Sequence, residues 1–186
     1  MLLRHAKSAW PDVPDHDRPL APRGLRDAPA AGRWLRQAGC IPDQVLCSTA
    51  RRARETWRLA ETELGVWPPA TFERGVYDAS ARSLLGRVRR LPPAARTVLV
   101  VGHDPAIPEL AVALAEEHGT HSRQAVTQTP GTSLDRMRAK FPTAAIAVLE
   151  FSGPWSALAH GHARLASFVT PREMGETHIK SHRQQR

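Results

Sequence analysis

The sequence predicts an α/β domain built on a largely parallel sheet. Short apolar strands alternate with amphipathic helices, and the clearest strand, residues 97–101, is a continuous run of apolar and mostly β-branched residues. Such runs suit strands that are covered by helices on both faces, as parallel strands usually are. The length of 186 residues fits one well-packed domain and is short for two.

The first 40 residues are expected to form a strand, a loop and a helix. Residues 1–3 are the stub of a strand, so short that either the chain starts further upstream or this strand is weakly anchored. Residues 10–19 are rich in Pro and Asp, which predicts a loop. A helix over residues 22–38, kinked at Pro29, should end at Gly39 as its C-terminal cap.

A second strand and helix follow at once. The run Gln-Val-Leu-Cys at residues 44–47 predicts the strand. Ser48 or Thr49 is then expected to cap a helix that ends near residue 64. The next helix should begin at Asp78 or Ser80 and end near residue 91.

The third strand, residues 97–101, leads into the turn Gly-His-Asp-Pro. Asp104 suits an N-cap and Pro105 the first position of a helix, so we expect a helix from there to about residue 117.

The last third of the chain begins with a polar stretch, residues 118–140, that reads as a loop. Two further strands are expected over residues 144–151 and 165–169. Residues 172–186 are polar and basic, which predicts a flexible tail and leaves residues 1–171 as a single domain.

The chain is strongly basic, with 26 Lys and Arg against 18 Asp and Glu and a formal net charge of +8. All but Lys7, Lys140 and Lys180 of the basic residues are arginines. Such an excess suits nucleic acid, an anionic membrane surface or a small phosphorylated substrate, and charge alone does not choose among them. The hydrophobic share of 41% excludes a wholly disordered chain.

Other classes of protein are disfavoured by what the sequence lacks. No apolar run reaches the roughly 20 residues of a membrane helix, and the N-terminus does not resemble a secretion signal, so we expect a cytoplasmic protein. Cys40 and Cys47 have no companions at zinc-ligand spacing and are expected to be buried free thiols. The histidine pairs also lack completing ligands, so no metal site is expected; they are His118 and His121, His160 and His162, and His178 and His182.

Three segments with chemically useful side chains lie where strands end. They are residues 3–6, 48–56 and 101–105, and together they supply two histidines and several arginines. Ligands of open α/β sheets bind beyond the carboxyl ends of the strands, so these side chains are expected to meet at one edge of the sheet. Each segment alone has an ordinary explanation, such as a structural histidine or a charged helix face. Their joint occurrence predicts a phosphate site.

Histidine and arginine fit the chemistry of phosphoryl transfer. A neutral imidazole is a nucleophile near neutral pH and can form a phosphohistidine that water later cleaves. The transferred phosphoryl group spreads negative charge over three oxygens, which guanidinium groups and a second imidazole can stabilise. With arginines supplying this charge, no metal is required.

These segments resemble a known family. The start Arg-His-Ala at residues 4–6, the Ser-x-x-x-Arg-Ala-x-Glu-Thr segment at residues 48–56 and Gly-His-Asp-Pro at residues 102–105 are similar to the histidine phosphatase superfamily. The motifs Asp-Arg-Pro-Leu, Tyr-Asp-Ala-Ser, Phe-Pro-Thr-Ala and Phe-Val-Thr-Pro-Arg extend the resemblance to its small bacterial branch, typified by the phosphohistidine phosphatase SixA. The resemblance implies a phosphoglycerate mutase-like fold, a three-layer α/β/α sandwich with a mostly parallel central sheet.

The resemblance also implies roles for individual residues. His5 would accept the phosphoryl group, Arg4 and Arg52 would bind its oxygens, and His103 would stabilise the transition state. Arg52 matches the motif because it directly precedes Ala53, whereas Arg51 and Arg54 would be peripheral. Arg18, in the Asp-Arg-Pro-Leu segment, would be a second-tier substrate contact.

The sequence departs from the family pattern at two positions and leaves the proton donor open. Ala6 stands where many members have Gly, and Asp104 replaces a frequent Asn. Larger relatives protonate the leaving group with a carboxylic acid, for which only Glu73, Asp78 and Asp104 are candidates by order. A missing acid suits a phosphoramidate such as phosphohistidine, because its leaving nitrogen needs less help than an alkoxide.

We therefore expect a metal-independent phosphatase that works through a phosphohistidine on His5 and acts on a phosphohistidine-carrying protein. A phosphatase of a small phosphoester metabolite is the alternative within the enzymes, whereas a mutase is disfavoured by the small size of the chain. A basic nucleic-acid-binding protein and a catalytically silent phosphate-binding relative remain as alternatives of other classes, although no nucleic-acid-binding motif supports the former.

Overall fold

The computed structural model describes residues 1–116 and 132–175. Within these ranges the chain forms a mixed sheet of six strands in the order β3-β2-β4-β1-β5-β6. The strands are β1 (Leu2–Arg4), β2 (Gln44–Ser48), β3 (Ala70–Glu73), β4 (Val98–Gly102), β5 (Ile146–Glu150) and β6 (Arg164–Val169). Strands β3, β2, β4 and β1 are parallel, and β5 runs antiparallel to both β1 and β6. The expected α/β class with a mostly parallel sheet is confirmed.

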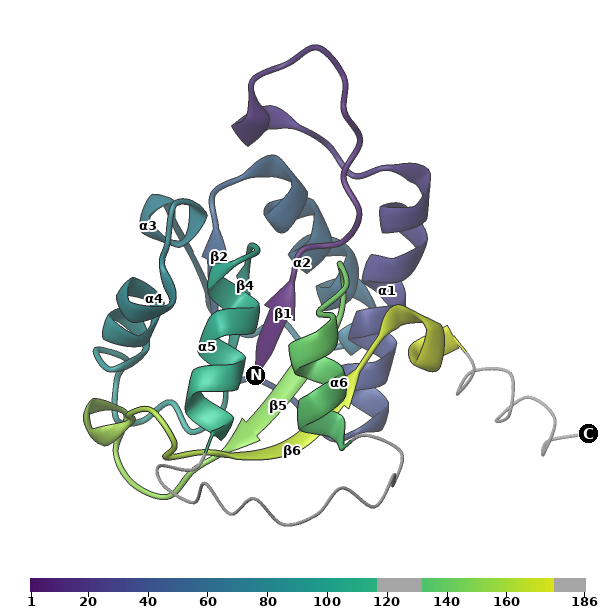
Figure 1. Cartoon of the computed structure of the whole chain (residues 1–186). Helices are drawn as coiled ribbons and strands as arrows, with labels where there is room; N and C mark the ends of the chain where they lie inside the picture. The colour runs from purple at the N-terminus through teal and green to yellow at the C-terminus, as the bar shows by residue number, and fades with distance from the viewer. Residues whose placement is uncertain (117–131, 176–186) are drawn as a thin grey trace, which may run out of the picture.

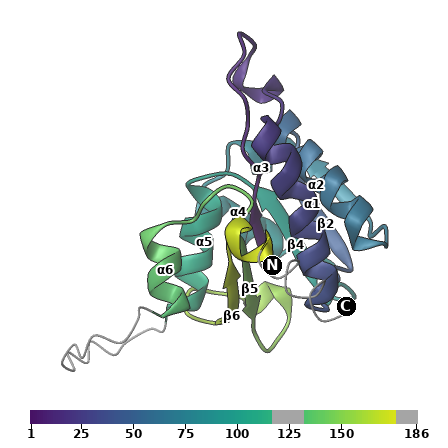
Figure 2. The same ribbon diagram turned by 90° about the vertical axis from the view of Figure 1, so that its right-hand side faces the viewer.

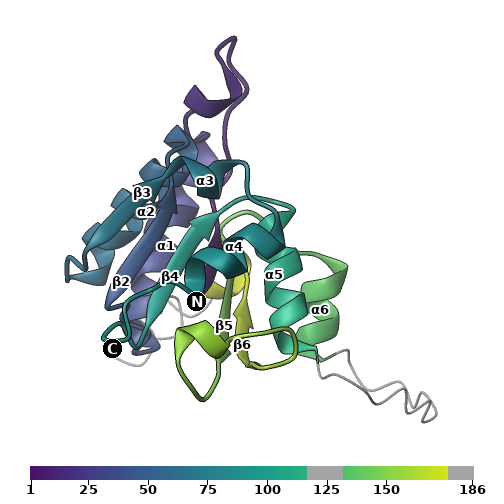
Figure 3. The ribbon, with the colours of Figure 1, turned by 90° about the vertical axis from the view of Figure 1, so that its left-hand side faces the viewer.

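Helices cover both faces of this sheet. They are α1 (Pro22–Gln37), α2 (Arg51–Leu64), α3 (Arg74–Tyr77), α4 (Ala81–Val88), α5 (Ala106–Ala115) and α6 (Ser133–Ala139), with short 3-10 turns η1 (Asp15–Asp17) and η2 (Trp155–Ala157). Helices α1 and α2 lie on one face, and α4, α5 and α6 lie on the other, as the two side views show (Figures 2 and 3). The result is the expected three-layer α/β/α sandwich.

The alternation of side chains along each strand produces two cores. Leu3, Val45, Leu99 and neighbouring residues of the sheet pack with α1 and α2, and the buried Trp57 belongs to this core. Residues one position away in the same strands, including Leu2 of β1, pack with α4 and α5 on the opposite face. Because strand side chains alternate between faces, strands covered on both sides must be apolar at every position. This is the pattern of residues 98–101 in β4.

The sheet topology places three loops at one edge. β1 lies between β4 and β5, with Arg4 opposite Gly102 of β4. This central position anchors the short first strand on both sides. β4 pairs in parallel with both β1 and β2, so the residues that follow β1, β2 and β4 lie at the same edge of the sheet. The loop between β1 and α1 projects beyond this edge (Figure 1).

Several element boundaries differ from the sequence expectations. Helix α2 is preceded by Ala50 as its N-cap, with no side-chain cap, because Ser48 still belongs to β2. Helix α5 has Pro105 at its N-cap, and Asp104 makes no capping hydrogen bond. Ser80, by contrast, caps α4 in a reciprocal capping box with Ser83.

Some elements were absent from the expectations. The four-residue edge strand β3 and the following turn of helix α3 lie in a stretch to which no element was assigned. The stretch 118–140, expected to be a loop, contains α6, whose capping box joins Thr132 and Asp135. The expected flexible tail was wrong at its start, because residues 171–175 are helical and Met174 is buried in the core that contains Trp57; residues 176–186 lie outside the described residues.

The remaining expectations concern the termini of helices, thiols and metals. α1 runs through Pro29 and is followed by Gly39 at φ 66°, a left-handed conformation suited to glycine. Cys47 is buried, whereas Cys40 is only half-buried, and both are free thiols. In the part of the chain that the structure describes, no helix could span a membrane and no group of three or more His, Cys, Asp or Glu residues could hold a metal ion. His118, His121, His178 and His182 lie outside this part.

Candidate active site

His5 lies directly after β1 and is held by the backbone of its neighbours. Its N–H donates to the carbonyl of Gly102 at 2.9 Å, which continues the β1–β4 pairing by one residue. The imidazole is buried, and its Nδ1 lies 2.8 Å from the carbonyl oxygen of Ala6. A carbonyl only accepts hydrogen bonds, so Nδ1 carries the proton and Nε2 is unprotonated.

The electrostatic surroundings keep His5 neutral. Burial lowers its pKa from 6.5 to about 4, and the nearby guanidinium groups of Arg52, Arg4 and Arg18 act in the same direction. The imidazole is therefore unprotonated at neutral pH, with Nε2 able to act as a nucleophile.

Arg52 reaches the same nitrogen from the first turn of α2. Its Nε donates to Nε2 of His5 at 3.3 Å, and the side chain is buried. The other end of the guanidinium group turns away, where Nη1 and Nη2 donate to the backbone carbonyl and the carboxylate of Asp15 at 2.6 and 3.0 Å.

The rest of the motif around Arg52 fixes this geometry. Ala53 is fully buried in the core between α2 and the sheet. Glu55 accepts a hydrogen bond from the backbone N–H of Leu20 at 2.8 Å, which ties the end of the loop after β1 to α2. The Thr56 hydroxyl accepts from the N–H of Ala6 at 3.0 Å, directly beside His5. Through these hydrogen bonds the Arg-Ala-x-Glu-Thr segment holds the segment that carries His5 in place.

Arg4 approaches from the last position of β1. Its Nη1 donates to the carbonyl of Phe141 at 2.6 Å and pairs with Asp104 Oδ2 at 2.8 Å. Its buried Nε has no hydrogen-bond partner within the described residues. An unsatisfied buried donor is costly, so a ligand that accepts from Arg4 would be favoured.

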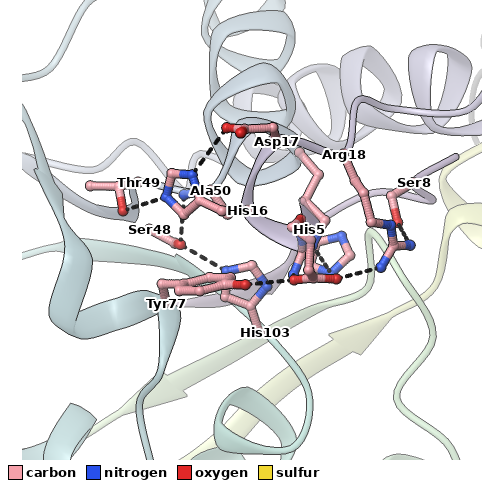
Figure 4. Close-up of polar contacts among 12 residues, drawn as sticks. His5, Ser8, His16, Asp17, Arg18, Ser48, Thr49, Ala50, Tyr77 and His103 are labelled. Carbon is pink, nitrogen blue, oxygen red and sulfur yellow. Dashed lines mark hydrogen bonds and ion pairs between the residues drawn. The ribbon is translucent and has the colours of Figure 1, made fainter. Parts of the chain in front are cut away.

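His103 follows β4 and faces His5, with the two ring centroids 5.0 Å apart. Its Nε2 lies 2.7 Å from the Ser48 hydroxyl at the end of β2 (Figure 4). Its buried Nδ1 has no hydrogen-bond partner in the described part of the chain. Burial, followed by the charges of His5 and Arg52, lowers the pKa of His103 to about 3.

Arg18 is a buried cation of the projecting loop. Its Nη2 donates to the Ser8 hydroxyl at 2.6 Å (Figure 4). Its Nε donates to the Ala9 carbonyl at 3.0 Å and its Nη1 to Asp15 at 2.7 Å. The guanidinium carbon lies 3.2 Å from the ring centroid of Trp10, a cation–π contact. Trp10 itself is 77% exposed.

These side chains line one cavity of about 190 Å³. The residues around it are Arg4, His5, Lys7, Ser8, Trp10, Arg18, Arg52, His103, Asp104 and Thr143. A neutral imidazole facing several guanidinium groups suits nucleophilic attack on a phosphoryl group, whose oxygens the cations can neutralise.

The structure brings together the five predicted site residues His5, Arg4, Arg52, His103 and Arg18. Of the candidate acids only Asp104 lines the cavity, where it pairs with Arg4 rather than capping α5. Glu73 pairs instead with Arg87 at 2.9 Å, and neither it nor Asp78 lines the cavity.

Three further residues of the site have no place in the sequence prediction. Asp15 and Tyr77 are joined by a hydrogen bond of 2.6 Å, and Ser48 supports His103. The Tyr-Asp-Ala-Ser motif contains Tyr77, to which no role was assigned, and Ser48 opens the Ser-x-x-x-Arg-Ala-x-Glu-Thr segment, where it was expected only as a helix cap. For Asp15 the three-residue spacing to Arg18 was the one available signal.

Comparison with known proteins agrees with the family that the sequence motifs predict. The family model described as "Histidine phosphatase superfamily (branch 1)" matches residues 1–80. An uncharacterized protein of Mycobacterium tuberculosis is 44% identical over 171 residues, which cover 91% of this chain and all of that protein.

Solved structures extend the similarity over most of the fold. The structure of a proposed phosphohistidine phosphatase SixA from Nakamurella multipartitia has a TM-score of 0.76 and 36% identity, and covers 91% of this chain and 95% of that one. A second such protein, from Agrobacterium tumefaciens, has a TM-score of 0.71 and 26% identity over 91% of this chain and 96% of its own.

Proposed function

The chain belongs to the histidine phosphatase superfamily, and on that premise we propose that it is a metal-independent phosphatase that forms a covalent phosphohistidine on His5. The observation that carries the proposal is the orientation of His5. Nδ1 lies 2.8 Å from the Ala6 carbonyl oxygen, which keeps the proton on Nδ1, and the unprotonated Nε2 accepts a hydrogen bond from Arg52 Nε at 3.3 Å.

The proposed reaction has two displacements. The Nε2 lone pair attacks phosphorus, a bond forms between Nε2 and phosphorus, and the bond to the leaving group breaks with its electron pair on the leaving atom. Water then attacks the phosphohistidine, the bond between Nε2 and phosphorus breaks with its electron pair on Nε2, and both protons of the water leave with inorganic phosphate. The imidazole returns to its neutral form with the proton still on Nδ1.

The cations of the cavity would stabilise both transition states. Arg52 and Arg4 can donate to phosphoryl oxygens, and the unpartnered Nδ1 of His103 is a third group that can do so in the neutral tautomer that carries its proton on Nδ1. Arg18 extends the positive lining toward Trp10.

A phosphoramidate, and specifically phosphohistidine, is the substrate class that the carboxylates favour. Asp104 is paired with Arg4, and a hydrogen bond from Tyr77 together with two arginines holds the pKa of Asp15 well below its ordinary range. Asp15 would be ionised and is not suited to protonate an alkoxide, and Asp104 Oδ2 is already engaged by Arg4 at 2.8 Å. The leaving nitrogen of phosphohistidine needs no strong acid.

A protein is the favoured carrier of that phosphohistidine. Trp10 is 77% exposed on the rim of the cavity, and Val13 of the same loop is 42% exposed. Exposed aromatic residues beside a site are typical of macromolecular contacts. The similarity to the protein from Nakamurella multipartitia supports the same substrate class.

Labelling tests the intermediate. Incubation with a phosphoryl donor should place acid-labile label on the wild type and none on His5→Ala, while the exposed histidine variant His162→Ala should label normally. Retained label in His5→Ala would overturn the mechanism. Rates with a phosphohistidine peptide, p-nitrophenyl phosphate and sugar phosphates then test the substrate class, and a preference for sugar phosphates would contradict it.

A further inference from the structure

We propose that Asp15 is a positioning residue that fixes the orientation of the Arg52 guanidinium group toward His5. The inference rests on the proposed function of His5 and Arg52. Asp15 contacts Arg18 and Arg52, two of the arginines that line the cavity, and also Tyr77.

Asp15 accepts hydrogen bonds from three different segments. Its Oδ1 accepts from Arg18 Nη1 at 2.7 Å within the same loop, and its Oδ2 accepts from Arg52 Nη2 at 3.0 Å. Oδ2 also accepts from the Tyr77 hydroxyl at 2.6 Å, and the Asp15 backbone carbonyl accepts from Arg52 Nη1 at 2.6 Å. Asp15 therefore joins the projecting loop to α2 and α3.

The contacts with Arg52 determine which N–H faces the nucleophile. A guanidinium group is a rigid plane, so hydrogen bonds to both of its Nη atoms set the direction of Nε. With Nη1 and Nη2 bound to Asp15, Nε–H points at Nε2 of His5, 3.3 Å away. Without the carboxylate, only the Asp15 backbone carbonyl still accepts from Arg52, so the guanidinium plane can rotate.

Asp15 acts through Arg52 and Arg18 rather than on the substrate. It does not line the cavity, whereas both arginines do. It stands behind them as an acceptor, as a carboxylate behind a metal-bound histidine does in other enzymes. It is thus a positioning residue and not a catalytic one.

Tyr77 is the third part of the arrangement. Its ring lies beside His103 (Figure 4), edge-on and with centroids 5.4 Å apart. Its hydroxyl donates to the Asp15 carboxylate at 2.6 Å. The end of α3 is thereby connected both to the loop and to the second histidine. Removal of the hydroxyl should loosen Asp15 without changing the charge of the site.

The charge of Asp15 predicts which kinetic constant changes. Asp15→Asn removes a negative charge beside Arg18 and Arg52, so the cavity becomes more positive and its attraction for a phosphate dianion is maintained. Alignment of Arg52 in the transition state is lost. Interactions made only in the transition state change kcat, whereas uniform binding changes KM.

The experiment compares Asp15→Asn with Asp17→Asn. Asp17 lies in the same turn, is 61% exposed and contacts His16 at 3.4 Å. For p-nitrophenyl phosphate we expect Asp15→Asn to lower kcat about 10- to 100-fold, the range found for supporting groups of active sites. KM should not rise, and Asp17→Asn should keep both constants. An unchanged kcat, or a raised KM at constant kcat, would overturn the proposal.

Two further measurements keep the test decisive. If Asp15→Asn fails to fold by circular dichroism, Tyr77→Phe replaces it and should lower kcat in the same direction with KM unchanged. Calorimetric titration with inorganic phosphate is independent of turnover, and Asp15→Asn should bind it at least as tightly as the wild type. Weaker binding would contradict the inference, whereas failure of His5 labelling with normal phosphate binding would overturn only the proposed function.

Discussion

At the residue scale, Ser48 is the hydrogen-bond partner of His103 Nε2, and we expect it to set the tautomer of this imidazole. The Ser48 oxygen already accepts the N–H of Ala50 at 3.1 Å, and its hydroxyl lies 2.7 Å from Nε2 of His103. A phosphoryl oxygen needs a hydrogen-bond donor. The neutral tautomer of His103 that supplies one carries its proton on Nδ1 and accepts a hydrogen bond from the Ser48 hydroxyl at Nε2. We therefore predict that the Ser48 hydroxyl donates to Nε2 and favours the tautomer that leaves Nδ1–H available to the cavity.

Ser48→Ala should therefore lower kcat/KM for p-nitrophenyl phosphate about 10-fold or more, because neutral His103 then has no fixed tautomer. Steady-state kinetics measure the effect. Thr62→Ala is the matched control, since the Thr62 hydroxyl bonds only the Arg58 carbonyl on the exposed side of α2. Equal rates in Ser48→Ala and the wild type would show that the tautomer is set by another group.

Sequence motifs identified the cavity residues but not the residues that hold them. His5, Arg52 and His103 each follow or open an element at a strand end, so the topology of a parallel sheet brings them together. Asp15 meets Arg52 across 37 positions and Tyr77 across 62. No local spacing reveals such contacts, because they depend on the path of the projecting loop.

At the scale of elements, the contact of α1 with α2 depends on Gly32. A Cβ atom at this position would lie 2.0 Å from the carbonyl oxygen of Ala60 in α2. A backbone atom cannot yield as a flexible side chain does, so the two helices would have to separate. This pair of helices covers one face of the sheet and carries Arg52 on α2 (Figure 2).

Gly32→Ala should lower the free energy of unfolding by about 1–3 kcal/mol or more, the usual cost of overpacking. Gly86→Ala in α4 is the matched control, because the nearest atom to its new Cβ is the end of the Arg90 side chain at 3.8 Å. Here the better helix propensity of Ala should raise stability by about 0.5–1 kcal/mol. Urea unfolding measures both changes, and equal effects in the two variants would contradict the packing argument.

The elements with a regular apolar pattern were predictable, and short or polar ones were not. β4 is apolar at every position because both of its faces are covered. β3 has four residues and an exposed Phe72 at the edge of the sheet, so it lacks that pattern. The cap of α2 was misplaced because Ser48 is used by β2 and by His103 instead.

At the scale of the whole molecule, the charge excess has two parts. Arg4, Arg18 and Arg52 surround the cavity, where Asp15 and Asp104 are their acidic partners. Other arginines form ion pairs at the surface, such as Arg23 with Asp27 and Arg51 with Glu55. Exposed pairs of this kind contribute about 0–1 kcal/mol each, so the net charge of +8 is no measure of stability.

The two buried histidines make stability depend on pH. Folding lowers the pKa of His5 to about 4 and that of His103 to about 3, from 6.5 in the unfolded chain. Above pH 6.5 both are neutral in both states, and they contribute no pH dependence. Between pH 6.5 and 4 the unfolded chain binds protons that the folded protein does not, so stability falls as pH falls.

Each histidine should lower the free energy of unfolding by up to about 1.4 kcal/mol per pH unit in this window. Urea unfolding at pH 7.5, 6.5, 5.5 and 4.5 measures the slope for the wild type. The double variant His5→Gln, His103→Gln should have a flatter profile below pH 6.5, because neither amide binds a proton, whereas the exposed-site variant His162→Gln should keep the wild-type slope. Carboxylates with lowered pKa values, such as Asp15, lose their contribution only at more acidic pH and act alike in all three proteins. Parallel profiles for the double variant and the wild type would mean that the two imidazoles are protonated in the folded state and that His5 is not held as a neutral nucleophile.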